Sequence, residues 1–112
     1  MSHVTLAAGE LDRRVTLEQA AITRDPSFGG EQPVWSTLAT VWAKVVEGPR
    51  AEDASAQLRL AARRATFTVR YRSDITAKMR IGYAGQKFRI VGDPAELGRK
   101  VGLVIEAEAF SV

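Results

Sequence analysis

The chain has no cysteine and only one histidine, His3, and these two gaps exclude many kinds of catalytic site. Without cysteine there is no disulfide, no thiol nucleophile and no cysteine-ligated zinc. A single histidine near the N-terminus leaves no histidine pair for a metal and removes most Ser-His-Asp arrangements. We therefore expect no catalytic residues, no metal and no cofactor, and we expect that the protein is not an enzyme.

Long hydrophobic runs are also missing. The longest unbroken run of apolar residues is three, as at 103–105, whereas a membrane-spanning helix needs about 20. The first 14 residues lack the basic start and the apolar stretch of an export signal. We therefore expect a protein that is made in a reducing cytosol and has no membrane partner.

The length and the composition are those of one small folded domain. The chain has 112 residues, of which 46% are hydrophobic and 26% are charged, so it can form one core but not two. Residues 1–9 are small and polar, and we expect them to form a flexible N-terminal arm. Residues 10–112 are expected to form a single domain.

Most of this domain shows the two-residue periodicity of β-strands. Segments with this alternation lie at 11–19, 39–46, 66–72, 79–91 and 101–110. Gly85, in the middle of the fourth segment, predicts a hairpin turn. These segments predict a mainly β protein, a small antiparallel β-barrel or sandwich of about six strands.

Residues 48–65 interrupt the β pattern. Gly48-Pro49 ends a strand and suits a helix start. Acidic residues then precede arginines, an order that complements a helix dipole, and alanines recur at helical spacing. We predict an insertion at 48–65 that contains one short helix at about 50–64.

Several aromatic side chains are candidates for contacts with other proteins. The segment 39–46 is apolar on both faces, so both faces are covered either by the fold or by another subunit. Its Trp42 is therefore either an interface residue or a large side chain that covers an open barrel end. Phe28, within the polar loop 23–33, either folds back onto the core or meets a partner.

The net charge of +3 conceals an uneven distribution. Residues 1–56 carry five basic and eight acidic residues, whereas residues 57–112 carry eleven and five. Residues 57–89 hold nine bases against Asp74 alone. The basic side chains of this segment either attract phosphates or acidic protein surfaces, or simply lie on faces that are exposed to solvent. It motivates one alternative function, a small basic β-barrel that binds nucleic acid. The alternation places Arg70 and Arg72 on the face opposite Phe67 and Tyr71, which weakens this alternative.

Three polar features have simpler interpretations than catalysis. Gly92–Lys100 differs from a phosphate-binding loop in its spacing, and we interpret it as a turn. Glu106 and Glu108 share one strand face, which predicts a solvated surface more than an acid–base pair. Asp74 lies among arginines and is expected to be an ion-paired turn residue.

The order of these pieces resembles the phage head–tail joining family, the head-closure or stopper proteins of tailed phages, with relatives in prophages and gene transfer agents. The matching pieces are Gly9-Glu10-Leu11 with Arg13–Leu17, the loop Asp25–Gly30, Trp35, Val41–Val45, Thr68–Arg72, Ile75-Thr76, Met79–Ile81 and Tyr83–Ile90. The resemblance covers residues 9 to about 92, but residues 48–64 vary within the family, so it implies nothing about individual residues there.

This resemblance implies a structural connector and no chemical reaction. It implies a small β-barrel whose copies form a homo-oligomeric ring, a hexamer or a dodecamer. The portal or adaptor protein lies on the head side of such a ring, and the tail terminator or tail tube protein lies on the tail side. The ring closes the channel for the packaged DNA and docks the tail. The expected location is the neck of a virion or phage-like particle, assembled in the bacterial cytoplasm.

The ring architecture turns two groups of residues into candidate contact sites. Arg59, Arg63 and Arg64 are candidates to line the channel, where they would contact DNA phosphates without regard to sequence. The candidates for contacts with neighbouring subunits or partners are Phe28, Trp35, Trp42, Arg70 and Arg72. A ring subunit joins its neighbours through two different surfaces, which apolar side chains on both faces of 39–46 would serve.

Overall fold

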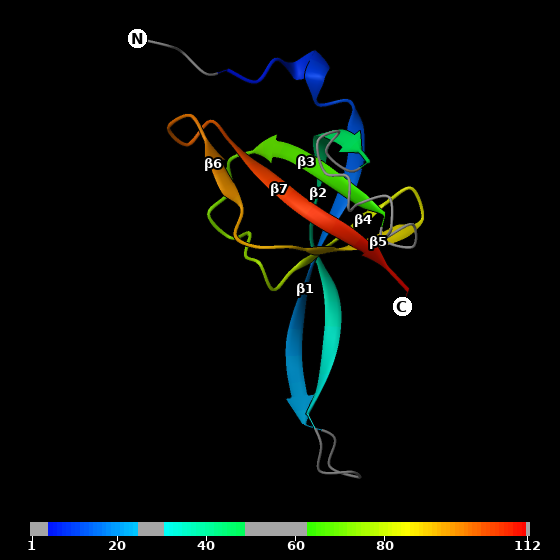
Figure 1. Cartoon of the computed structure of the whole chain (residues 1–112). Coiled ribbons are helices and arrows are strands. Elements are labelled where there is room, and N and C mark those ends of the chain that lie inside the picture. Colours follow the sequence, from blue (N-terminus) through cyan, green and yellow to red (C-terminus); the bar gives the residue numbers. More distant parts are fainter. Residues whose placement is uncertain (1–4, 25–30, 49–62, 112) are drawn as a thin grey trace.

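The computed structural model describes residues 5–24, 31–48 and 63–111, which form seven β-strands and one short 3-10 turn (Figure 1). The elements are η1 (Ala8–Glu10), β1 (Arg13–Arg24), β2 (Glu31–Glu47), β3 (Arg64–Arg70), β4 (Arg80–Tyr83), β5 (Gln86–Ile90), β6 (Ala95–Leu97) and β7 (Gly102–Phe110).

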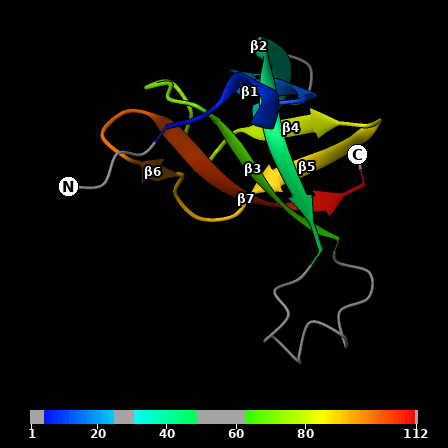
Figure 2. The ribbon, with the colours of Figure 1, turned by 90° about the horizontal axis from the view of Figure 1, so that it is seen from above.

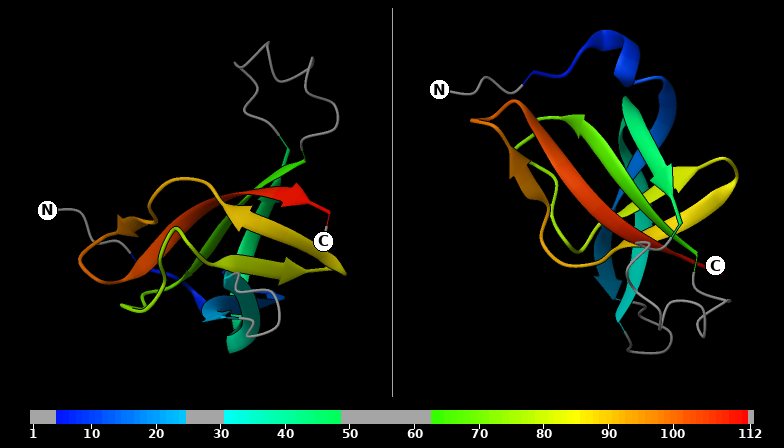
Figure 3. Two further views of the ribbon diagram at one scale, coloured as in Figure 1. Left: turned by 90° about the horizontal axis from the view of Figure 1, so that it is seen from below. Right: turned by 45° about the horizontal axis from the view of Figure 1, so that its top comes forward.

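Six of the strands close into an antiparallel barrel. Their order is β3-β2-β1-β4-β5-β7, and an additional pairing of β3 with β7 closes the circle (Figures 2 and 3). The short strand β6 is added to β7 outside this circle. Closure leaves the six barrel strands without free edges over their paired lengths. The prediction of a mainly β barrel of about six strands is confirmed.

The alternation seen in the sequence separates the barrel core from its outer surface. Phe67 is fully buried, and its ring meets those of Tyr83 and Phe88 edge-on, with centroids 5.9 and 5.3 Å apart. The other large side chains that are almost fully buried are Val15, Leu17, Val69, Ile81 and Ile105. These positions belong to the faces that alternation marks as apolar, so this part of the prediction is confirmed.

The turn of the β4–β5 hairpin lies where the sequence predicts it. Ala84 and Gly85 both have positive φ, 51° and 78°, as a type I′ turn requires.

Two local predictions are wrong. Residues 92–100 contain a strand as well as turns, because β6 pairs with the start of β7. Three residues are too few for a recognisable alternation. The predicted helix also extends too far, since Arg64 belongs to β3 and lies opposite Glu108. At this position, backbone pairing with β7 outweighs the local preference for a helix. The rest of the predicted helix, 49–62, lies outside the described residues.

A bulge divides the long β1–β2 hairpin into two parts. The pairing shifts between Leu17, which faces Ala39, and Glu18, which faces Thr37, so Leu38 is an extra residue on β2. Beyond the bulge lies a two-stranded ribbon, residues 19–24 and 31–36, which we call the hairpin extension. It projects away from the barrel (Figure 1). Bulges bend a ribbon and increase its twist, so this one sets the direction of the extension.

Close packing at Gly102 gives a stability prediction. A Cβ atom there would lie 2.8 Å from the backbone oxygen of Val69 and 2.6 Å from Cδ1 of Leu6. Gly102→Ala is therefore expected to lower the free energy of unfolding by about 1–3 kcal/mol, because the backbone must shift. Urea denaturation measures this, with Gly9→Ala as the control, since a Cβ at Gly9 meets nothing within 4 Å. Equal stability losses in the two variants would contradict the prediction.

Candidate interaction surface

The bulge places both tryptophans of β2 on the outer face of the hairpin. Trp35 and Trp42 are seven positions apart, which in a regular strand would put them on opposite faces. The extra residue Leu38 restores a common face. Trp42 lies opposite Arg14 and Trp35 lies opposite Ala20, and these two partners are six positions apart on β1.

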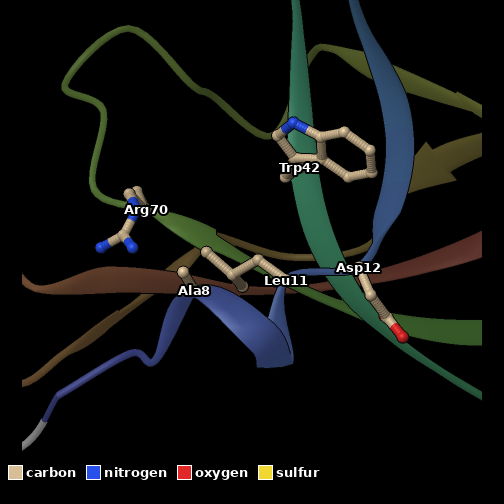
Figure 4. Close-up of a pocket in the computed structure, with 5 residues that line it drawn as sticks. All are labelled: Ala8, Leu11, Asp12, Trp42 and Arg70. Carbon is tan, nitrogen blue, oxygen red and sulfur yellow. The ribbon is translucent and has the colours of Figure 1, made fainter.

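Trp42 borders a hollow on the outer surface. Its side chain is 50% exposed, and the guanidinium of Arg14 lies 5.0 Å from the centre of its ring. The hollow has a volume of about 540 Å³. Figure 4 shows the residues that line it, which are Ala8, Leu11, Asp12, Trp42 and Arg70. Trp42 is therefore not part of the barrel core. We call these five residues and Arg14 the Trp42 hollow.

Trp35 lies against a buried ionic cluster at the base of the hairpin extension. The guanidinium of Arg80 lies 4.1 Å from the centre of the Trp35 ring, and its Nε donates to Oε1 of Glu18 at 2.5 Å. The ammonium of Lys87 donates to the other oxygen, Oε2. Glu18 and Arg80 are only 8% and 9% exposed. The cluster ties the extension to the β4–β5 hairpin.

Strand pairing brings this cluster together. Glu18 lies opposite Arg80, and Thr16 lies opposite Gly82, which in turn faces Lys87. A Cβ at Gly82 would lie 3.4 Å from Nζ of Lys87 and 3.9 Å from Oε2 of Glu18. These are ordinary contact distances, so it is the register of the three strands that lets Lys87 reach diagonally past Gly82 to Glu18.

Two opposing effects act on the pKa of Glu18. Burial raises the pKa of this carboxyl, whereas the hydrogen bonds and charges of Lys87 and Arg80 lower it. The lowering is larger than the raising, so the pKa of Glu18 lies below its ordinary value. The charged form is therefore the one that the folded protein stabilises.

Other cations of the basic segment are also paired with carboxylates. Arg63 pairs with Glu47, and Arg89 lies 3.6 Å from Glu108. Arg72 donates to both carboxylate oxygens of Asp74, at 3.0 and 2.9 Å, and the pKa of Asp74 is lowered by this bond. The expected ion pair of Asp74 is thus confirmed. Within the described residues, the two arginines of the Trp42 hollow, Arg14 and Arg70, pair with no carboxylate.

The candidate residues from the sequence fall into separate places. Arg63 and Arg64 are both exposed. Arg64 is the first residue of β3, and Arg63 precedes it in the chain, directly after residues 49–62. Trp42 and Arg70 both line the hollow, whereas Trp35 belongs to the ionic cluster and Arg72 to the connection after β3. The remaining two, Phe28 and Arg59, lie outside the described residues.

The described part of the chain contains little that resembles a reaction centre. No group of three or more histidine, cysteine or acidic residues within it is placed to hold a metal. Of the two strand-face glutamates, Glu108 contacts Arg89. No helix among the described residues is long and apolar enough to cross a membrane.

Sequence reasoning did not identify the ionic cluster. Glu18, Arg80 and Lys87 are far apart in the chain and look like ordinary exposed charges of alternating strands. Only the pairing of β1 with β4 and β5 makes them neighbours. One signal was present, because Glu18 is a lone acid on a strand face that an antiparallel basic hairpin can cover.

Comparisons with known proteins agree with the fold. The model of the family described as phage head completion protein matches residues 6–109. The solution structure of protein SF1141 from Shigella flexneri 2a is 30% identical, with a TM-score of 0.70, and the match covers 93% of this chain and 96% of that one. A chain in the virion of a native gene transfer agent particle is 25% identical, with a TM-score of 0.65, covering 88% and 93%. No curated protein matches.

Proposed function

The chain belongs to the phage head completion protein family, and from this premise we propose that its copies form a ring at the neck of a phage or phage-like particle. The family is structural, which agrees with the expectation that the protein is not an enzyme. The observation that carries the proposal is the family match over residues 6–109, almost the whole fold. The similarity to a chain of a gene transfer agent virion supports a place in the particle.

The proposed ring contains six or twelve copies and has a different partner on each side. The portal or adaptor protein lies toward the head, and the tail terminator or tail tube protein lies toward the tail. A ring needs two different surfaces on each subunit. The Trp42 hollow and the hairpin extension are two such surfaces on one chain, at different ends of the β1–β2 hairpin (Figures 1 and 4).

The outer aromatic and basic side chains are the proposed contacts with neighbours. Trp42 and Arg70 are the strongest candidates, because the first is half-exposed, the second is exposed, and both line the hollow. Trp35 and Arg72 already contact Arg80 and Asp74, so their part is to hold the local surface in shape. Phe28 remains a candidate from its sequence alone.

An experiment on particle assembly tests this function. Deleting the gene from its phage or element is expected to leave DNA-filled heads without tails, and adding purified protein to such heads is expected to restore tail joining in vitro. Electron microscopy and a titre of tailed particles measure the result. Normal tailed particles in the deletion strain would refute the proposal.

The proposed channel residues give a second prediction. The double variant Arg63→Gln with Arg64→Gln is expected to release packaged DNA more readily, because phosphate contacts are lost in every subunit. Nuclease sensitivity of the packaged DNA measures the release, over a range of salt concentrations. The control is Arg99→Gln with Lys100→Gln, two exposed cations in the turn before β7. Equal release from the two double variants, or an assembled ring with Arg63 and Arg64 on its outer rim, would contradict a channel role.

The alternative of a free nucleic-acid-binding barrel has less support in the structure. Among the bases of residues 57–89, several are already paired with carboxylates, namely Arg63, Arg72, Arg80, Lys87 and Arg89. Of these, Arg80 is only 9% exposed, so the fold screens it from a phosphate. A gel-shift titration separates the two functions, since micromolar DNA binding by the isolated chain at physiological salt would favour the alternative.

A further inference from the structure

The hairpin extension is attached to the barrel through one side chain. Of its side chains that the structure describes, those of residues 19–22 and 33–36, only that of Trp35 is not exposed. None of these residues belongs to the hydrophobic core or to the apolar side chains packed around it. β1 pairs with β4 only as far as Glu18, so within the described residues the backbone of the extension pairs with itself alone. The contact of Trp35 with Arg80 is therefore the side-chain connection between the extension and the barrel.

The bulge at Leu38 is the point at which the ribbon bends most easily. The backbone ladder between β1 and β2 is interrupted there, between Leu17 and Glu18 on β1, because Leu38 has no partner on that strand. An isolated two-stranded ribbon is only marginally stable in water. An arm that leaves the barrel at such a point keeps one angle only where a second attachment holds it.

Four strands cooperate in the second attachment. The guanidinium of Arg80, on β4, lies 4.1 Å from the centre of the Trp35 ring on β2, in the range of a cation–π contact. Nε of Arg80 donates to Glu18 on β1 at 2.5 Å, and Lys87 on β5 donates to the other oxygen of the same carboxylate. Glu18 thus fixes the position of Arg80, and Arg80 fixes the position of the Trp35 ring.

Glu18 and Arg80 are nearly buried although they lie on the outer face of the barrel. Their neighbours along the strands, Leu17 and Ile81, are fully buried in the core, and successive side chains of a strand point to opposite faces. A charged side chain on an outer face is normally exposed to water. Here the ring of Trp35 lies over the guanidinium of Arg80, so the base of the extension covers the cluster from outside.

We propose that the ionic cluster is a clamp that holds the hairpin extension at one fixed angle to the barrel, and that the bulge becomes a hinge when the clamp opens. Trp35 is the contact on the extension, and Glu18 and Lys87 are positioning residues that act through Arg80. An arm that is already held in one orientation loses less conformational freedom when another protein binds it. The inference concerns the single chain and does not rest on the proposed ring.

Distances between two spin labels test this inference, because the chain has no native cysteine to compete for the labels. The labelled full-length chain carries Ile22→Cys on the extension and Ala95→Cys on β6, both at exposed positions. Ile22 lies four residues beyond Glu18, so a tilt of the extension by about 30° at the bulge would move the first label by about 7 Å. The labelled chain without further changes is expected to give one narrow distribution of distances.

Two variants of the labelled chain open the clamp in different ways. Glu18→Gln removes the charge that holds Arg80, and Trp35→Ala removes the ring that rests on it. Both are expected to widen the distance distribution by about 7 Å or more, because the extension then tilts at the bulge. Trp35→Ala leaves the ion pairs of Glu18 in place, so it tests the clamp even where Glu18→Gln does not fold.

Two controls separate the clamp from general stability. Trp35→Phe keeps an aromatic ring for Arg80, and its distance distribution is expected to stay narrow. Val69→Ala removes methyl groups from a fully buried side chain on β3, which pairs with β2 and β7 but with neither β1 nor β4. This variant is expected to unfold at a lower urea concentration and to keep the narrow distribution.

Narrow distributions in Trp35→Ala and in folded Glu18→Gln would overturn the inference, because the extension would then be fixed without the cluster. A wide distribution in the labelled chain without further changes would overturn it as well. Equal widening in Val69→Ala would also overturn it, because loosening of the extension would then be a general result of lower stability. These distances are independent of the proposed function, since a particle without a ring at its neck would remove that function and leave them unchanged.

Discussion

Replacing Trp42 by alanine is expected to abolish tail joining while the barrel stays folded. The side chain is half-exposed and lies outside the core, so its loss removes little intramolecular packing. A tryptophan at the centre of an interface contributes about 2 kcal/mol or more to binding. Every contact between subunits of a ring loses this binding energy. The substitution therefore prevents ring assembly, although it would only weaken a complex that has a single such contact. The yield of tailed particles in the in vitro complementation assay measures this effect.

Trp42→Phe is the matched control for this prediction. Phenylalanine keeps an aromatic ring beside Arg14 and should retain most of the tail joining. Thermal unfolding of the isolated chains checks that both variants have a barrel as stable as the original to within about 1 kcal/mol, as for a surface change. Tailed particles at the original yield with Trp42→Ala would show that the hollow is not an interface.

Replacing Glu18 by alanine is expected to lower the free energy of unfolding by about 3 kcal/mol. Glu18 neutralises Arg80, which is only 9% exposed, and removing one partner leaves a buried charge without compensation. Arg80 also supports Trp35, so the base of the hairpin extension loosens as well. Urea denaturation near neutral pH measures the loss. The control is Asp74→Ala, which breaks an exposed pair with Arg72 and should cost less than about 1 kcal/mol.

The same substitution predicts a pH dependence. The pKa of Glu18 is lower in the folded protein than in the unfolded chain, so its contribution is complete above the unfolded pKa and is lost as the pH falls through the folded pKa. The stability difference between the original chain and Glu18→Ala should therefore shrink as the pH falls below about 4, the ordinary range of a glutamate. A difference that stays constant at acidic pH, or matches that of Asp74→Ala at neutral pH, would mean that the cluster does not stabilise the fold.

Much of the barrel could be predicted because alternation is a local property that burial enforces. Phe67 and Val69, for example, lie on one face of β3 and are fully buried. Elements that depend on pairing with distant strands could not be predicted from local alternation. β6 exists because β7 offers it an edge, and Arg64 is extended because it lies opposite Glu108.

The interaction surface was predictable only in part. Trp42 was identified as an interface candidate because a strand that is apolar on both faces needs cover on both. The bulge at Leu38 has no signature in the sequence, yet it decides that Trp35 shares a face with Trp42. The partners of Trp35 and Trp42, Arg80 and Arg14, come from other strands, so their stacking follows from register and not from spacing along the chain.

The most direct test of a neck ring is an image of the particle by electron cryomicroscopy. We expect a ring of density between the portal and the tail into which the six-stranded barrel fits, with each subunit contacting the next. Immunolabelling of the same particles should place the chain at that ring. A neck whose density excludes this barrel, or labelling confined to the capsid shell or to the tail tip, would contradict the central claim.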